Sequence, residues 1–325
     1  MTLEPAVRAH LDAMAESSLA PADMVAFRVF LTAEIDRMFE KFGEPGPPVA
    51  DVRDHRVPVS GGAEIVVRTY HPDPAAVLPA HVVLHGGGWT TGSIDELVAD
   101  GSARHRAVRA NCVVVLVEYR LAPEHRFPIP VHDVVAAVRW LTENAVALGV
   151  DPATVTLGGS SAGANLAAAA VVAEPALGIA ALLLEVPALD LTLGTATATC
   201  ADLVVQHGPD SEIGDLLSRT LALLDRARRD YLGHLELAEL STASPLLVPD
   251  LTRFPPTYIQ TAQWDPLRTD GSAFVQRLRD AGVRASVTCY PGALHGSPIL
   301  TATWPTARRW QDDLIARLVD VHGRA

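Results

Sequence analysis

Short runs of apolar, often β-branched residues alternate with longer segments of helical periodicity from about residue 51 onward. Most of these runs are apolar at nearly every position, which is typical of strands buried on both faces of a parallel sheet. Because a helical segment follows each run, the pattern predicts an α/β fold with a mostly parallel central sheet and helices on both faces. The candidate strands are residues 64–71, 81–86, 112–120, 154–159, 179–188, 256–264 and 284–291.

Two local patterns refine this prediction. Residues 50–60 form a further run that joins the first candidate strand through Gly61 and Gly62, which favours an antiparallel hairpin at the sheet edge. Residues 131–149 carry apolar side chains at helical spacing and end in Gly149, a residue that suits a helix C-cap. We expect this helix to pack on the sheet.

Two segments fall outside the alternation of strands and helices. We interpret residues 1–50 as an N-terminal helical cap segment, and residues 195–240 as a cap insertion in a domain that spans residues 51–325. The alternative is that these helices are ordinary packing elements. In the first segment, the side chains roughly along one stripe are Phe27, Leu31, Ile35, Met38 and Phe42.

The composition narrows the class of protein. Of the 325 residues, 49% are hydrophobic and 20% charged, and no apolar run approaches the roughly 18 residues of a membrane span. Acidic residues and an arginine interrupt the N-terminal stretch where a signal peptide would be continuously apolar, so we expect a cytoplasmic location. A net charge of −12, without a lysine or arginine run, argues against nucleic acid as a partner.

Cysteine and lysine usage argue against several further chemistries. Cys112, Cys200 and Cys289 are widely separated and odd in number, which fits neither a disulfide framework nor a zinc site, so we expect reduced core residues. Lys41 is the only lysine, and its surroundings match neither a P-loop nor a Schiff-base site.

The segment GGSSAG, residues 158–163, places two adjacent serines between a candidate strand and a strongly helical segment. A serine on such a sharp turn is held exposed, and the residues two positions before and after it must be very small. Ser161 has glycine at both positions, whereas Ser160 has Gly158 before it and Ala162 after it. We therefore predict Ser161 as a nucleophile. The alternative is a glycine-rich turn without chemistry.

A second glycine-rich segment, HGGGW at residues 85–89, also follows a candidate strand. Three successive glycines leave backbone N–H groups free to approach a ligand, as the oxyanion of a tetrahedral intermediate requires. The alternative is a flexible turn.

The two glycine-rich segments resemble those of the hormone-sensitive-lipase family of α/β-hydrolases, which pairs HGGG with a later GDSAGG. Here the second motif reads GSSAGA, with Ser160 where the family usually has aspartate and Ala164 where it usually has glycine. The resemblance covers essentially the whole chain beyond residue 50, and it implies the α/β-hydrolase fold with a helical cap. It continues through YRLAPEHRFPIP (119–130), SPLL (244–247), DPLRTDG (265–271) and YPGALHG (290–296).

By this resemblance, the oxyanion donors are the N–H groups of Gly87, Gly88 and Ala162, and His85 helps to shape the loop. Arg120 and Glu124 also resemble family positions, and we expect them to hold loops together.

The catalytic base in this fold follows the nucleophile and the acid in chain order. We predict His295, because it alone follows a candidate strand through a short turn and so reaches the sheet edge that carries Ser161. The other histidines after Ser161 lie in the predicted cap insertion, His207 and His234, or near the C-terminus, His322.

The acid must end a strand beside the histidine loop. Asp265 directly follows the candidate strand 256–264, and the resemblance supports it as the acid of a Ser161–His295–Asp265 triad. Its competitors are Asp190, which follows an earlier strand, and Asp270, which helix capping would explain.

The sequence thus predicts a serine carboxylesterase that works by two-step acyl transfer and needs no metal or organic cofactor. The resemblance implies short- to medium-chain acyl esters as substrates, and it suggests a homodimer. The alternatives are hydrolysis of an activated amide, a lactone or an acetylated specialised metabolite, and a ligand-binding protein without catalysis.

Overall fold

The computed structural model describes residues 5–15, 23–208 and 211–323. Residues 1–4 and 16–22 of the predicted N-terminal cap, and 209–210 of the predicted cap insertion, lie outside the described residues. Within the described part, eight strands form one sheet in the order β1-β2-β4-β3-β5-β6-β7-β8. The strands are β1 (Asp51–Pro58), β2 (Glu64–His71), β3 (Leu78–Leu84), β4 (Val113–Glu118), β5 (Val150–Ser160), β6 (Ala181–Glu185), β7 (Thr257–Trp264) and β8 (Ala285–Leu294).

The direction of the strands follows the predicted pattern. β1 pairs antiparallel with β2, and β2 antiparallel with β4, so the edge hairpin predicted around Gly61 and Gly62 is confirmed. From β4 through β3 to β8 all neighbouring strands are parallel. Each predicted strand is present, with ends shifted by a few residues.

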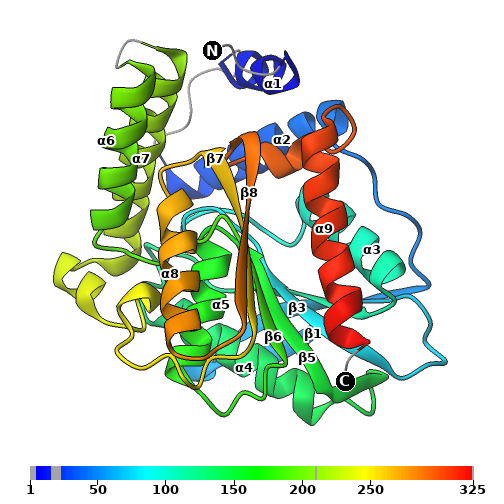
Figure 1. Ribbon diagram of the computed structural model, residues 1–325. Coiled ribbons are helices and arrows are strands. Elements are labelled where there is room, and N and C mark those ends of the chain that lie inside the picture. The colour runs from blue at the N-terminus through cyan, green and yellow to red at the C-terminus, as the bar shows by residue number, and fades with distance from the viewer. Residues whose placement is uncertain (1–4, 16–22, 209–210, 324–325) are drawn as a thin grey trace.

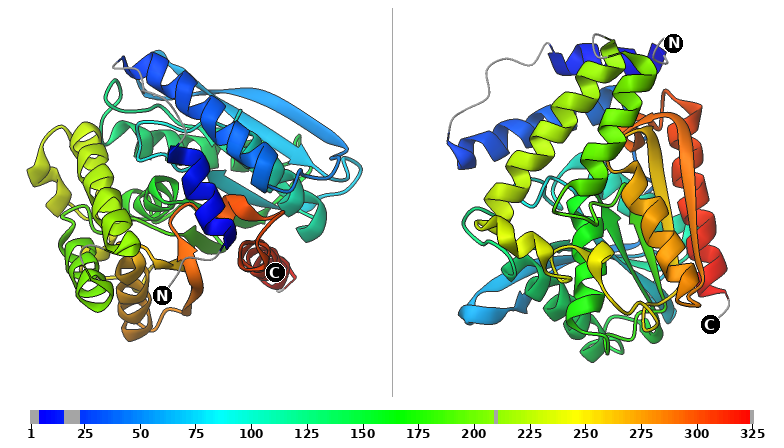
Figure 2. Two further views of the ribbon diagram at one scale, coloured as in Figure 1. Left: turned by 90° about the horizontal axis from the view of Figure 1, so that it is seen from above. Right: turned by 60° about the vertical axis from the view of Figure 1, so that its left-hand side comes forward.

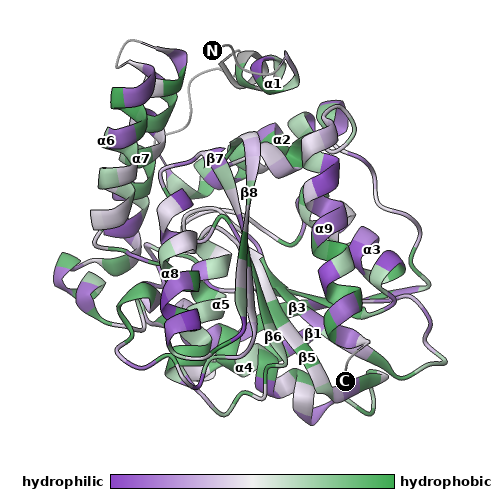
Figure 3. Cartoon of the chain, viewed as in Figure 1, coloured by the Kyte–Doolittle hydropathy of each residue, from purple (hydrophilic) through white to green (hydrophobic). Residues whose placement is uncertain are grey.

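Helices cover both faces of the sheet (Figure 1). One face carries α4 (Ile129–Glu143), α5 (Ala162–Ala173) and α8 (Arg268–Asp280), which share one apolar cluster with the strands. The opposite face carries α3 (Leu97–Ala110) and α9 (Pro305–His322), which share another. Figure 3 shows the apolar strands enclosed by helices whose polar residues lie outward. The predicted α/β architecture, a mostly parallel central sheet with helices on both faces, is confirmed.

The remaining helices lie beyond the carboxyl ends of the parallel strands, at the top of Figure 1, which is the side that faces the viewer in the left view of Figure 2. They are α1 (Pro5–Ala15), α2 (Met24–Phe42), α6 (Gly194–His207) and α7 (Glu212–Leu232). Short 3₁₀ turns lie at Ser60–Gly62, Leu235–Glu239, Pro245–Leu247 and Ser297–Leu300. None of the helices in the described part of the chain combines the length and apolarity needed to cross a bilayer.

Two local predictions are wrong. The helix expected to end at Gly149 ends at Glu143 instead, because the Asn144 side chain bonds the Trp140 carbonyl and turns follow as far as Gly149, which has φ +62°. Cys289, expected in the core, is exposed, because β8 is the last strand of the sheet. Cys112 and Cys200 are buried free thiols.

Candidate active site

Ser161 lies at the sharp turn where β5 passes into α5. Its backbone has φ +54° and ψ −114°, a conformation that L-residues rarely adopt. The turn is fixed from the neighbouring strand, because the Ser161 N–H donates to the Glu185 carbonyl at 2.8 Å. The strained backbone therefore belongs to a hydrogen-bonded turn and carries the hydroxyl at the carboxyl edge of the sheet.

No residue larger than glycine fits at the positions two residues before and after Ser161. A Cβ on Gly159 would lie 2.7 Å from the carbonyl carbon of Gly163, and a Cβ on Gly163 would lie 2.3 Å from the carbonyl oxygen of Leu84. Backbone atoms cannot move away as a flexible side chain can. Any larger residue at either position would therefore displace the turn.

His295 and Asp265 reach this turn from the ends of β8 and β7. Ser161 Oγ lies 2.8 Å from His295 Nε2, and His295 Nδ1 lies 2.8 Å from Asp265 Oδ2. Asp265 is 1% exposed, and its second oxygen accepts the Leu267 N–H at 3.0 Å. The carboxylate is thus fixed at both oxygens, and the imidazole is fixed at both nitrogens.

Two opposing effects act on the pKa of His295. Burial disfavours the charged imidazolium and lowers the pKa, whereas the negative charge of Asp265 and its hydrogen bond raise it. The net result is a pKa raised above the ordinary value for histidine. A proton taken from Ser161 would therefore be stabilised on the imidazole by Asp265.

The glycine loop after β3 brings backbone N–H groups to the same place. A Cβ on Gly86 would lie 3.7 Å from Ser161 Cβ, so the two turns are in close contact. The Gly87 carbonyl accepts the N–H groups of Thr90 and Thr91 at 3.2 and 3.0 Å, which closes the loop on itself. Within the described residues, the N–H groups of Gly87 and Gly88 have no backbone acceptor.

The third predicted donor, Ala162, is the first residue of α5. The first N–H groups of a helix have no partner within the helix, and the positive end of the helix dipole lies there. The arrangement can thus stabilise negative charge on an oxygen near Ser161 Oγ.

His85 and Tyr119 support the glycine loop from below. Their rings stack with centroids 4.2 Å apart, and the Tyr119 hydroxyl donates to the His85 carbonyl at 2.9 Å. His85 Nδ1 lies 2.7 Å from the Gly86 carbonyl, and burial lowers the pKa of His85, which favours a neutral ring. His85 therefore lies under the loop, as its predicted role requires.

The loop also contacts α7. The indole of Trp89 stacks on Tyr231 of α7, with centroids 4.8 Å apart, and its N–H donates to Asn165 Oδ1 at 3.2 Å. A Cβ on Gly88 would lie 2.9 Å from the Ala227 Cβ, so α7 packs directly on the loop. Neither Tyr231 nor Asn165 stands in a sequence motif that predicts this contact. The tryptophan that ends HGGGW was the only signal of an aromatic partner.

The two competing acids have other partners. Asp270 Oδ2 accepts the N–H groups of Leu189 and Asp190 at 2.8 and 3.0 Å, so it fixes the loop after β6 rather than capping its own helix. Burial raises the pKa of Asp270 to about 7. Asp190 in turn binds Thr192 and Thr195.

The other candidate histidines lie elsewhere. His207 packs edge-on against Trp264 with ring centroids 4.5 Å apart. His234 is exposed beside Glu236, and His322 Nε2 lies 3.2 Å from Thr156 Oγ1. Of the histidines considered, only His295 lies within hydrogen-bonding distance of the Ser161 hydroxyl.

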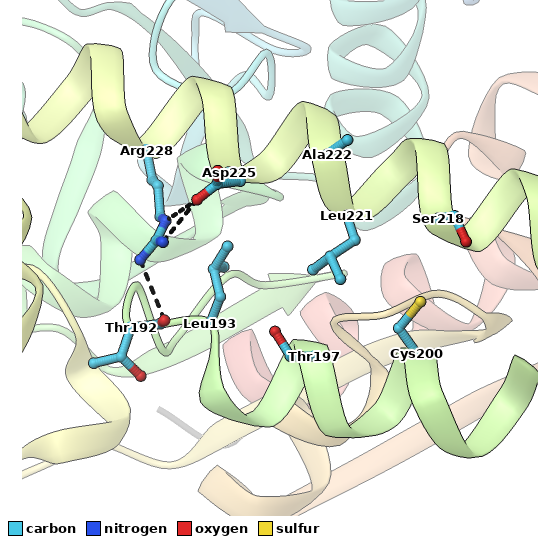
Figure 4. A pocket seen from close by; sticks show the side chains of 9 residues that line it. All are labelled: Thr192, Leu193, Thr197, Cys200, Ser218, Leu221, Ala222, Asp225 and Arg228. Atoms are coloured by element: carbon cyan, nitrogen blue, oxygen red, sulfur yellow. Dashed lines mark hydrogen bonds and ion pairs between the residues drawn. The ribbon is translucent and has the colours of Figure 1, made fainter.

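A pocket of about 400 Å³ lies between α6, α7 and the loop after β6 (Figure 4). Arg228 pairs with Asp225 at 2.7 Å and donates to the carbonyls of Leu191 and Thr192, which closes one end. None of the predicted triad or oxyanion residues lines it. The lining residues are Thr192, Leu193, Thr197, Cys200, Ser218, Leu221, Ala222, Asp225 and Arg228.

Metal ligation is a separate question. Metal ions in proteins are held by grouped histidine, cysteine and carboxylate side chains. Across residues 5–15, 23–208 and 211–323, no three such side chains lie close enough together to hold an ion. Asp265 and His295 instead bond each other, which is the arrangement that orients an imidazole for proton transfer.

Comparisons with known proteins identify relatives of this chain. A family model described as the alpha/beta hydrolase fold matches residues 81–299. Carboxylesterase NlhH of Mycobacterium tuberculosis is 36% identical over 253 residues, which are 77% of this chain and 76% of that protein. Arylacetamide deacetylase of Bos taurus is 31% identical over 297 residues, 72% of each chain. The hyperthermophilic esterase of Pyrobaculum calidifontis superposes with a TM-score of 0.84 at 31% identity, covering 98% of this chain and 99% of that one.

Proposed function

The chain belongs to the α/β-hydrolase family, as the resemblance to hormone-sensitive lipases predicted, and is a carboxylic ester hydrolase; on that premise we propose that it is a serine carboxylesterase with a Ser161–His295–Asp265 triad. The observation that carries the proposal is the unbroken hydrogen-bond path from Asp265 through His295 to the Ser161 hydroxyl. This path lies beside the free N–H groups of the glycine loop.

The first half-reaction is acylation of Ser161. His295 Nε2 takes the hydroxyl proton while Oγ attacks the ester carbonyl, and Asp265 stabilises the imidazolium that forms. The N–H groups of Gly87, Gly88 and Ala162 bind the oxyanion of the tetrahedral intermediate. The intermediate collapses when the carbon–oxygen bond to the alcohol breaks, and His295 gives its proton to the departing alkoxide.

The second half-reaction is hydrolysis of the acyl-enzyme. His295, again neutral, takes a proton from water, whose oxygen attacks the acyl carbonyl. The same N–H groups bind the second oxyanion, and Ser161 leaves with the proton held by His295. The raised pKa of His295 supports the steps in which the imidazole takes a proton, from Ser161 or from water, because the imidazole holds a proton more firmly than free histidine does.

The two segments at the carboxyl edge of the sheet form the cap in this proposal. Residues 1–50 contribute α1 and α2, and residues 195–240 contribute most of α6 and all of α7. The contact of α7 with Gly88 supports this division, because it closes the space beside the oxyanion hole. The preference for short- to medium-chain acyl esters, the cytoplasmic location and the homodimer stay predictions from the sequence.

The test is a series of p-nitrophenyl esters from acetate to a long acyl chain, with Ser161→Ala and Ser160→Ala as a matched pair. We expect an optimum at short or medium chains. Ser161→Ala should reduce kcat by about 10⁴-fold or more, whereas Ser160→Ala should retain most of the activity. Full activity in Ser161→Ala, together with its loss in Ser160→Ala, would refute the assignment of the nucleophile.

A second candidate, hydrolysis of an aryl amide, is favoured by the relative named arylacetamide deacetylase. The same triad and oxyanion donors serve both reactions, but the amine must be protonated as it leaves. Rates on p-nitroacetanilide and p-nitrophenyl acetate compare the two leaving groups with one acyl group. A kcat/KM on the anilide that equals the value on the ester would make the amidase the better description.

A further inference from the structure

We propose that Arg28 of α2 is a positioning residue for the oxyanion hole, holding the glycine loop from the N-terminal cap segment. This inference rests on the proposed function, because it assigns Arg28 a task in the same ester hydrolysis. Arg28 does not touch the reacting atoms. It acts through the backbone of residues 87–91 and through the neighbouring loop at residues 119–126.

The guanidinium of Arg28 bonds three acceptors from two separate segments. Its Nε donates to the Thr90 carbonyl at 2.7 Å, and one terminal nitrogen donates to the Ala122 carbonyl at 2.8 Å. Both terminal nitrogens bond the Glu124 carboxylate, at 3.0 and 2.6 Å. These bonds lower the pKa of Glu124 and keep it ionised. Residues far apart in the sequence are thus joined at one side chain.

These contacts bear directly on the oxyanion loop. The Thr90 N–H donates to the Gly87 carbonyl, so Thr90 belongs to the turn that presents the N–H groups of Gly87 and Gly88. The Ala122 N–H donates to the Trp89 carbonyl at 2.9 Å. Arg28 therefore bonds the loop once directly, at Thr90, and once through Ala122. Displacement of the guanidinium would remove the bond to Thr90 and would free the Ala122 carbonyl, leaving the Ala122–Trp89 backbone bond without its anchor on α2.

The arrangement of acceptors suits arginine better than lysine at this position. A guanidinium carries five N–H donors in a planar fork, whereas a lysine ammonium is a single compact charge that cannot span the same acceptors. The Arg28 side chain is 23% exposed and the Glu124 side chain 44%, so the ion pair alone contributes little to folding. The two bonds to backbone carbonyls are the ones that fix the loop.

Docking of α2 does not depend on Arg28 alone, which provides a matched control. Asp36, on the same helix, accepts the Leu97 N–H at 2.8 Å, and the Phe42 carbonyl accepts the Ala302 N–H at 3.0 Å. Neither bond touches the glycine loop. Asp36→Ala therefore loosens the cap helix without removing a contact to residues 87–91.

The experiment compares wild type, Arg28→Met, Arg28→Lys and Asp36→Ala on p-nitrophenyl butyrate, together with the inhibition constant of butylboronic acid. The Ser161 oxygen adds to boron as His295 takes the proton, so one boronate oxygen enters the oxyanion hole. We expect Arg28→Met to lower kcat about 10-fold, to raise the inhibition constant by a similar factor and to leave KM within about 2-fold. Arg28→Lys should give the same pattern with a smaller change, and Asp36→Ala should not.

Three other outcomes would contradict either the proposed function or the role of Arg28. If wild type neither hydrolyses the ester nor binds the boronic acid, the proposed function fails. If wild type is active but Arg28→Met raises KM with kcat unchanged, Arg28 acts on substrate binding and the inference is overturned. If Asp36→Ala reproduces the loss of kcat and of boronate affinity, cap docking in general explains the effect, and the inference is overturned as well.

Discussion

The two halves of the candidate active site are built in different ways. Ser161, His295 and Asp265 extend directly from the ends of strands in the sheet, and their side chains fix one another by hydrogen bonds. The glycine loop has no side chains at the proposed donor positions. It is held from outside, by Tyr119 beneath it, by Tyr231 of α7 and by Arg28 of α2.

The difference separates the candidate triad from the helices that contact the glycine loop. None of the hydrogen bonds within the candidate triad involves α2 or α7. The glycine loop, in contrast, is contacted by both of these helices. Changes in the triad should therefore abolish catalysis outright, whereas changes in the cap should weaken stabilisation of the transition state by degrees.

The largest effect is expected from a substitution in the triad. Asp265→Asn should lower kcat by about 10⁴-fold, because an amide can hold the imidazole in the wrong tautomer and cannot stabilise its charged form. The pH midpoint of the residual activity should move downward, because the carboxylate no longer raises the pKa of His295. Rates measured between pH 5 and 9 check both points.

Asp190→Asn is the matched control for Asp265→Asn. It removes a competing acid whose side chain bonds Thr192 in the loop after β6 and Thr195 at the start of α6. Its pH midpoint should equal that of wild type. A shift in Asp190→Asn comparable with that in Asp265→Asn would contradict the assignment of the acid.

The next largest effect is expected from a substitution in the glycine loop. Gly87→Ala should reduce kcat by about 10²- to 10³-fold, as loss of an oxyanion donor does. Its φ is +113°, and a Cβ would lie 2.2 Å from the Thr91 carbonyl oxygen, so the turn must move. Steady-state rates and circular dichroism separate this loss from unfolding.

Gly88 offers a contrast that involves the cap. A Cβ there meets the Ala227 Cβ of α7 at 2.9 Å, at a φ of +59°. Gly88→Ala should be rescued in part by Ala227→Gly, whereas Gly87→Ala should not be. Failure of the rescue would mean that backbone strain at Gly88, and not its contact with α7, limits the loop.

A smaller effect is the pH dependence of wild type. The base must be neutral to accept the Ser161 proton, and the pKa of His295 is raised. kcat/KM should thus fall about 10-fold per pH unit below a midpoint that lies above about 6.5. A rate that stays constant down to pH 5 would contradict His295 as the base.

The smallest effect tests the aromatic support of the loop. Tyr231→Leu removes the ring that stacks on Trp89 and should lower kcat several-fold. Tyr231→Phe keeps the ring and removes a buried hydroxyl that has no partner among the described residues, so its activity should match wild type. A comparison of kcat for the two variants checks this. Equal losses in both variants would show that the hydroxyl matters and the ring does not.

The sequence predicted the fold, and it brought Ser161, Asp265 and His295 forward as candidates, because strands and the turns that follow them leave local patterns. The strands are continuous apolar runs, and Ser161, Asp265 and His295 each follow such a run within a few residues. No local sequence pattern marks Arg28 or Tyr231 as a contact of the glycine loop. Arg28 bonds a carbonyl 62 residues away, and a carbonyl is present in every residue, so the sequence cannot mark its acceptor. The predicted helix end at Gly149 is wrong because the helix ends at Glu143, where the Asn144 side chain bonds the Trp140 carbonyl.

The backbone of Ser161 has a consequence for stability. Its left-handed conformation costs on the order of 1–3 kcal/mol in any residue with a Cβ, and glycine would adopt it without that cost. Glycine in place of Ser161 would relieve this backbone cost and, on the proposed function, abolish activity in the same step. Catalytic activity and an unstrained backbone are thus in direct conflict at this one position.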